Sequence, residues 1–147
     1  KTVMSLTIES ILNGVTEDVI TNRLEHLIER VLNGEIEDRV LYIKARLKRN
    51  LDEYRTLGEA RAGAAWANKH LGKGYMKGDY FLSTLADDGS YLAFDDPKEI
   101  EGIANIGYKL ICERFIIDKV EKYYQIMRWD MQPLHNSLNG LSNLAWL

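Results

Sequence analysis

Apolar residues recur at a helical spacing through the first third of the chain. Between residues 16 and 32 the steps from one apolar residue to the next are 4, 3 and 4, at Ile20, Leu24, Leu27 and Val31. Such spacing places these residues on one face of an α-helix. The same kind of spacing continues from about residue 35 to residue 57, at Ile36, Val40, Ile43, Leu47, Leu51 and Tyr54. The pattern therefore predicts two successive amphipathic helices, over 16–32 and 35–57.

A Leu-Asn-Gly triplet follows three of the apolar-periodic stretches, at residues 12–14, 32–34 and 138–140. Asn and Gly tolerate the left-handed backbone conformation that ends many helices. Each triplet therefore predicts a helix end, and the chain should begin as short helices joined by tight turns.

The middle of the chain changes character. Residues 59–71 are rich in Ala and Gly, which predicts a helix that packs closely on its neighbour and is anchored by Trp66. Two short aromatic-rich runs then flank Asp87-Asp88-Gly89-Ser90. Asp-Gly between two such runs is typical of a β-hairpin, which we expect over about 80–94.

A long helix is predicted over about 97–131. Asp96, Pro97 and Glu99 have the spacing of a helix N-terminal capping box. Apolar residues then recur every seven positions, at Ile103, Leu110, Ile117, Tyr124 and Met131. Further apolar residues between them make the helix apolar on several sides, which is typical of a central helix. Pro133 should end it, and a short final helix follows.

These elements predict a mainly α fold. We expect an irregular bundle of five to six helices around the long central helix at 97–131, with the small β-hairpin at 80–94. The length of 147 residues predicts one domain over 1–147, with a short hairpin insertion and an apolar C-terminal tail.

Composition narrows the class of protein. Hydrophobic residues make up 46% and charged residues 28% of the chain, which excludes a disordered or collagen-like protein. A single cysteine excludes an internal disulfide and a Cys-x-x-Cys zinc site. No apolar run reaches the roughly 18 residues of a membrane span, and the first residues do not resemble a signal peptide. We therefore expect a cytoplasmic protein.

Charge is unevenly distributed although the net charge is only −3. Nine basic and three acidic residues lie between residues 44 and 77, and six acidic residues follow between 87 and 101. A basic region of this kind can contact nucleic-acid phosphates. The candidate contacts are Lys44, Arg46, Lys48, Arg49, Lys73 and Lys77. Tyr75 and Tyr80 are candidate stacking surfaces for bases. The competing interpretation is two solvated charged faces without a partner.

Residues for catalysis or metal binding are not grouped in the sequence. No nucleophile-elbow, zinc-protease, Walker or dinucleotide-binding motif occurs, and the three histidines are far apart. Cys112 lies in the most apolar stretch and is expected to be a buried, inert thiol. The acids around residues 87–96 do not have the spacing of a calcium-binding loop. We therefore predict a protein that is not an enzyme and holds no metal or cofactor.

The C-terminal tail carries an apolar stripe that is costly to leave in water. Its candidate partner-binding residues are Leu138, Leu141, Leu144, Trp146 and Leu147. They could cover a groove of the same chain, or bind a second subunit as a helix binds a groove. The leading prediction is a non-enzymatic protein–protein interaction module, a self-associating subunit or a regulatory or assembly component. The alternative is a nucleic-acid-binding accessory protein that uses the basic 44–77 region.

Overall fold

The computed structural model describes residues 3–35 and 41–140. These residues are mostly helical, with five helices, the longest of 20 residues, and one three-stranded antiparallel sheet. The predicted fold class is thereby confirmed. Contacts divide the chain into two compact units, which we describe separately: a helical unit within 1–36 and 108–147, and a sheet unit within 37–107. That the whole chain is a single domain stays a prediction.

The sheet unit is built on three strands in the order β1 (Ile43–Arg46), β2 (Tyr80–Leu85) and β3 (Tyr91–Phe94). β2 and β3 form the predicted hairpin. Its turn is stabilised by Asp88, whose Oδ1 accepts hydrogen bonds from the Ser90 backbone N–H (2.9 Å) and hydroxyl (2.6 Å). β1 pairs antiparallel with the other edge of β2, so that Arg46 lies opposite Tyr80.

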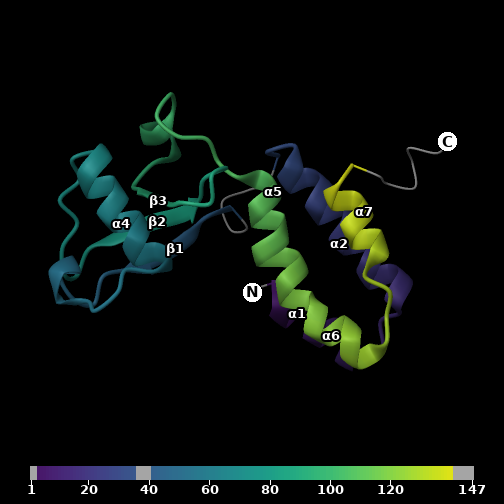
Figure 1. Cartoon of the computed structure of the whole chain (residues 1–147). Helices are drawn as coiled ribbons and strands as arrows, with labels where there is room; N and C mark the ends of the chain where they lie inside the picture. Colours follow the sequence, from purple (N-terminus) through teal and green to yellow (C-terminus); the bar gives the residue numbers. More distant parts are fainter. Residues whose placement is uncertain (1–2, 36–40, 141–147) are drawn as a thin grey trace. The chain divides into compact units, whose positions relative to one another are not determined.

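Helix α4 (Glu59–His70) packs on β2 and β3 (Figure 1). Its buried residues are the small ones, Gly63, Ala64 and Ala67. A Cβ atom on Gly63 would lie 2.6 Å from the carbonyl oxygen of Leu92, so the helix backbone approaches β3 too closely for any side chain there. The half-buried Trp66 packs against the apolar residues of the core, as predicted.

The helix predicted over 35–57 is wrong for residues 43–57, and residues 36–40 lie outside the described part of the chain. The segment forms β1 and then a single 3-10 turn, η1 (Leu51–Glu53). Alternation explains the strand, because Ala45 and Leu47 pack into the core while the alternate residues, Lys44 and Arg46, are exposed.

The capping signal at residues 96–99 begins one turn of 3-10 helix, η2 (Pro97–Ile100), instead of the long helix. Asp96 Oδ1 accepts a hydrogen bond from the Lys98 N–H, and Glu99 Oε1 accepts one from the Asp96 N–H, each 2.9 Å long. The turn ends because Gly102 takes a φ of 75° and Ile106 then pairs with Ala86 in a β-bridge.

The helical unit contains α1 (Val3–Leu12), α2 (Glu17–Leu32), a continuous helix from Tyr108 to Met127, and α7 (Gln132–Leu138). The continuous helix comprises α5 (Tyr108–Ile111), a π-helical segment (Cys112–Ile117) and α6 (Asp118–Met127). α1, α2 and α7 end at the Leu of a Leu-Asn-Gly triplet, and all three glycines have positive φ angles. The helix ends predicted from these triplets are confirmed.

The helix from Tyr108 to Met127 is central to this unit, because it contacts α1, α2 and α7 (Figure 1). Its buried residues are Ile111, Cys112, Ile116, Ile117, Val120 and Tyr124. The Tyr124 hydroxyl is hydrogen-bonded to the Thr21 hydroxyl of α2 at 2.6 Å. The central position is therefore as predicted, whereas the predicted bounds of 97–131 are wrong. The helix ends at Arg128, which has a left-handed conformation, and Pro133 lies in the first turn of α7.

Among the described residues, we find no helix with the length and apolar character needed to cross a bilayer. The cytoplasmic location stays a prediction.

Candidate nucleic-acid interface

Two loops that are far apart in the sequence lie side by side, next to the end of β1 and the beginning of β2. The Gly78 N–H donates to the Leu47 carbonyl oxygen (2.8 Å), and the Leu47 N–H donates to the Asp79 carbonyl oxygen (3.1 Å). The Lys77 N–H donates to Asn50 Oδ1 (2.8 Å). Backbone bonding therefore joins the loop that follows β1 to the loop that precedes β2.

This pairing gathers five of the six basic residues singled out in the sequence. We call them the basic surface; they are Lys44, Arg46, Lys48, Arg49 and Lys77. All five are exposed. None of them makes an ion pair with any residue in 3–35 or 41–140. Their charges are therefore available to an anionic ligand.

An exposed aromatic ring lies within the basic surface. Lys44 and Arg46 share one face of β1, because side chains two residues apart in a strand point the same way. The Arg46 guanidinium carbon lies 5.3 Å from the ring centroid of Tyr80, its partner on β2. Tyr80 is 59% exposed. A base could stack on this ring while the surrounding cations contact phosphates.

Three acidic residues lie in these two loops; Asp79 and Glu53 make local hydrogen bonds, and Asp52 is exposed. Asp79 is half-buried, and its Oδ2 accepts a hydrogen bond from the Met76 N–H (2.9 Å). Glu53 accepts one from the Asn50 N–H (3.3 Å). These contacts shape the two loops and leave the five cations unneutralised.

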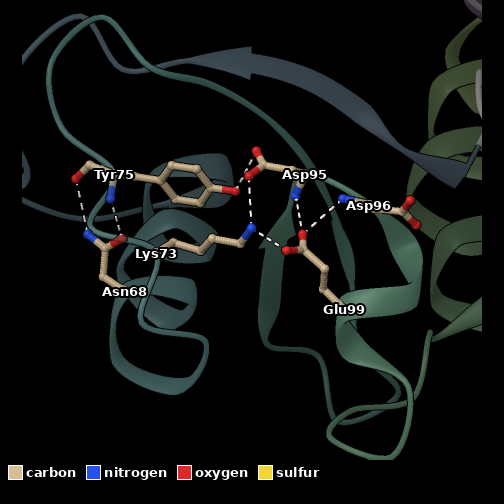
Figure 2. Close-up of polar contacts among 6 residues, drawn as sticks. All are labelled: Asn68, Lys73, Tyr75, Asp95, Asp96 and Glu99. Atoms are coloured by element: carbon tan, nitrogen blue, oxygen red, sulfur yellow. Dashed lines mark hydrogen bonds and ion pairs between the residues drawn. The ribbon is translucent and has the colours of Figure 1, made fainter.

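Lys73, the sixth basic candidate, belongs to a separate polar cluster with Tyr75, Asp95 and Glu99 (Figure 2). Its ammonium is paired with Asp95 Oδ2 at 2.8 Å and with Glu99. The Tyr75 hydroxyl donates to Asp95 Oδ1 (2.9 Å), and Glu99 Oε1 accepts the backbone N–H groups of Asp95 and Asp96. The cluster ties the glycine-rich loop to the end of β3, so Lys73 is engaged within the chain.

Burial and hydrogen bonding shift the pKa values in this cluster. Hydrogen bonds to Asp95 and Glu99 raise the pKa of Lys73. Burial alone would raise the pKa of Glu99, but the hydrogen bonds from Lys73 and from two backbone N–H groups outweigh it and lower that pKa. Burial, followed by the hydrogen bond to Asp95, raises the pKa of Tyr75. The cluster therefore favours a protonated lysine, an ionised glutamate and a neutral tyrosine.

We expect K73M to lower the free energy of unfolding by about 1 kcal/mol near neutral pH, the upper range for an exposed ion pair. The pKa of Glu99 is lowered on folding, so its contribution is present above about pH 4.5, its ordinary pKa, and is lost as the pH falls. The pKa of Lys73 is raised, so its contribution is lost only as the pH rises past 10.5, its ordinary value. Thermal unfolding of K73M and wild type should therefore differ most between pH 5 and about 10. K69M, at an exposed position of α4, is the matched control. If K73M is less stable than the wild type by the same amount at pH 2 as near neutral pH, this assignment is wrong.

The two tyrosines proposed for stacking have different environments. Tyr75 is buried against Phe81, with ring centroids 5.0 Å apart, and cannot receive a base. Tyr80 is the ring that the fold exposes. No local sequence signal distinguishes the two tyrosines, because Tyr75 lies within the same glycine-rich stretch that Tyr80 follows.

The candidate partner-binding residues of the tail are only partly described. Leu138 lies in α7 and is buried, with 8% of its surface exposed, and α7 packs on α2. Leu141, Leu144, Trp146 and Leu147 lie outside the described residues. Binding of a partner by the tail stays a prediction.

The acids at residues 87–101 and Cys112 are the remaining candidates for metal binding or nucleophilic chemistry. Within 3–35 and 41–140, no three His, Cys, Asp or Glu side chains are grouped closely enough to hold a metal ion. Cys112 is fully buried as predicted, and burial raises the pKa of its thiol to about 12. A thiol with so high a pKa is protonated at neutral pH and is a poor nucleophile.

Comparison with known protein families and with curated protein sequences gives no match for this chain.

Proposed function

We propose that this chain is a non-enzymatic protein that binds single-stranded nucleic acid through the basic surface. One observation carries the proposal: two segments joined by backbone hydrogen bonds present five exposed cations, one of which, Arg46, lies over the exposed ring of Tyr80, and none of the five is ion-paired with a described acid.

The combination of charge and aromatic surface favours nucleic acid over other anions. Phosphates repeat along a strand at a spacing that several cations can contact at once. Bases of a single strand are free to stack on Tyr80, whereas the bases of a duplex are already stacked on one another. Arg46 supports such a stack, because its guanidinium lies over the same ring.

The sequence alone favoured protein binding, whereas the geometry favours the alternative. The apolar tail that motivated the protein-binding prediction lies mostly outside the described residues, and Leu138 is buried within the helical unit. Self-association through the tail remains a prediction beside the present proposal.

Fluorescence anisotropy of a labelled 15-nucleotide oligo-dT with the full chain tests the proposal. If all five cations contact phosphates, the logarithm of the binding constant should fall against the logarithm of salt concentration with a slope of about −3.5. A 15-base-pair duplex should bind more weakly. No binding at 25 mM NaCl, or a slope near zero, would contradict the proposal.

Tyr80 variants separate base stacking from general attraction between charges. Y80F retains the ring and should preserve the preference for oligo-dT. Y80A should weaken oligo-dT binding by roughly 1–3 kcal/mol, the usual contribution of one stacked base, while the salt slope stays the same. If Y80A binds oligo-dT as tightly as the wild type, the ligand is a general polyanion and the single-strand assignment is wrong.

A further inference from the structure

A second candidate binding surface lies in the helical unit, between α1 and α2. The two helices border a groove of about 330 Å³. Its apolar side chains are Leu6 from α1 and Ile20, Leu24 and Leu27 from α2. Leu6 is 49% exposed and Leu27 is half-buried, so the groove presents apolar surface that no described residue covers.

The rim of this groove is basic. Arg23, His26 and Arg30 line it from α2, and all three are exposed. No Asp or Glu lines the groove, and neither arginine makes an ion pair within the described parts of the chain. Arg23 and Arg30 are seven residues apart, which is about two helical turns, so they lie on the same face of α2 on either side of Leu27.

Charge is segregated across α2. Three of its four acidic residues, Glu17, Asp18 and Glu25, line a different hollow together with Asp130, and the fourth, Glu29, lines neither hollow. The hollow lined by Arg23, His26 and Arg30 therefore has no acidic residue in its lining, and the hollow on the other flank of α2 has no basic one. This separation gives the groove a single sign of charge beside an apolar floor.

We propose that the groove binds an amphipathic helix of a partner protein whose apolar stripe is flanked by acidic residues. Leucine-type side chains of such a helix would cover Leu6 and Leu27, and its carboxylates would pair with Arg23 and Arg30. A nucleic acid would pair with the arginines but leave the apolar floor uncovered. The chain's own residues 141–147 contain no Asp or Glu, so they lack the charge that the rim requires. This partner site is separate from the basic surface of the sheet unit.

The probe is a synthetic 18-residue alanine-based peptide, acetylated and amidated, with leucines along one helical stripe and glutamates on both flanks. A second peptide carries glutamine in place of each glutamate. Fluorescence anisotropy with the full chain should show binding of the glutamate peptide at least about tenfold tighter than binding of the glutamine peptide. Equal binding of the two peptides, or no binding of either, would overturn the proposal.

A charge exchange assigns the binding to this groove. R23E/R30E should bind the glutamate peptide about tenfold or more weakly than the wild type does. It should bind a third peptide, which has lysines in place of the glutamates, more tightly than the wild type does. K119E/K122E makes the same charge change at exposed positions of α6 and should bind the glutamate peptide as the wild type does. Circular dichroism checks that both variants are folded. If R23E/R30E binds the glutamate peptide normally, the groove is not the site.

Two further measurements identify other occupants. Light scattering of the wild type that shows a dimer, together with a monomer for R23E/R30E, would identify a second copy as the occupant and overturn the proposal. Binding to phosphatidylglycerol vesicles that R23E/R30E loses, without any peptide binding, would identify a lipid surface and overturn it too. R23E/R30E should leave oligo-dT binding unchanged, so the outcome here is independent of the proposed function.

Discussion

Replacing Ile117 with alanine should lower the free energy of unfolding by about 2–5 kcal/mol, the usual cost of truncating a buried isoleucine. Ile117 is 3% exposed and lies at the end of the π-helical segment in the central helix of the helical unit. Its side chain belongs to the buried face that contacts α1, α2 and α7. Truncation removes apolar contacts and leaves a cavity, and both effects destabilise the fold. Chemical denaturation monitored by circular dichroism measures the loss.

Ile126 provides a matched control in the same helix. Its side chain is 66% exposed, so I126A should change the free energy of unfolding by less than about 0.5 kcal/mol. The pair compares one chemical change at a buried and at an exposed position. A loss below about 0.5 kcal/mol for I117A would mean that the central helix is not the core of this unit.

Local signals predicted the helical unit well. The Leu-Asn-Gly triplets ended α1, α2 and α7 where expected, because the left-handed conformation of a helix end depends on one or two residues. The apolar residues at positions 20, 24 and 31 are buried on α2 as their spacing predicts. Such features need no knowledge of distant contacts.

β1 was missed although its signal was present. Ile43, Ala45 and Leu47 alternate with Lys44, Arg46 and Lys48, which is the period of a strand. The same residues also fit a helical period when Val40 and Leu51 are included. Pairing with β2 decides between the two patterns, because each β1 residue from Ile43 to Arg46 has a partner on β2. That partner lies more than 30 residues away, so a short window cannot detect it.

The start of the central helix was misplaced for a related reason. Asp96 and Glu99 do cap a turn, as predicted, but a cap specifies only where a turn begins. Gly102 and the bridge between Ala86 and Ile106 then direct the chain along the sheet before the helix starts at Tyr108. The seven-residue spacing that begins at Ile103 therefore extends beyond the helix.

The residues of the candidate site could be predicted from the sequence, whereas their arrangement in space could not. Charge counting identified the six basic residues, because it needs only the sequence. It could not separate Lys73 from the others, since the partners of Lys73 are 22 and 26 residues away at Asp95 and Glu99. It also could not separate the buried Tyr75 from the exposed Tyr80, because that difference arises only when the sheet forms.

The combined variant K44E/K48E/K77E should abolish oligo-dT binding while the protein stays folded. All three lysines are exposed and unpaired among the described residues, so their replacement breaks no internal contact. Each charge-assisted phosphate contact contributes roughly 1.5–3 kcal/mol, so losing three should lower the affinity by at least about 1000-fold. The salt slope should fall by about 2 in magnitude, since three phosphate contacts are lost. Lys73 is left in place because its removal would disturb the Asp95–Glu99 cluster.

The control variant carries the same change of net charge in the helical unit. K109E/K119E/K122E replaces three exposed lysines of the helix from Tyr108 to Met127. If net charge alone governed binding, both triple variants would lose oligo-dT equally. If the basic surface is the site, the control should lose less than about tenfold, because Lys109, Lys119 and Lys122 are not part of that surface and would make none of its phosphate contacts. Equal losses from the two triple variants would show that the attraction is a property of the whole chain and would remove the main support for a binding site on β1.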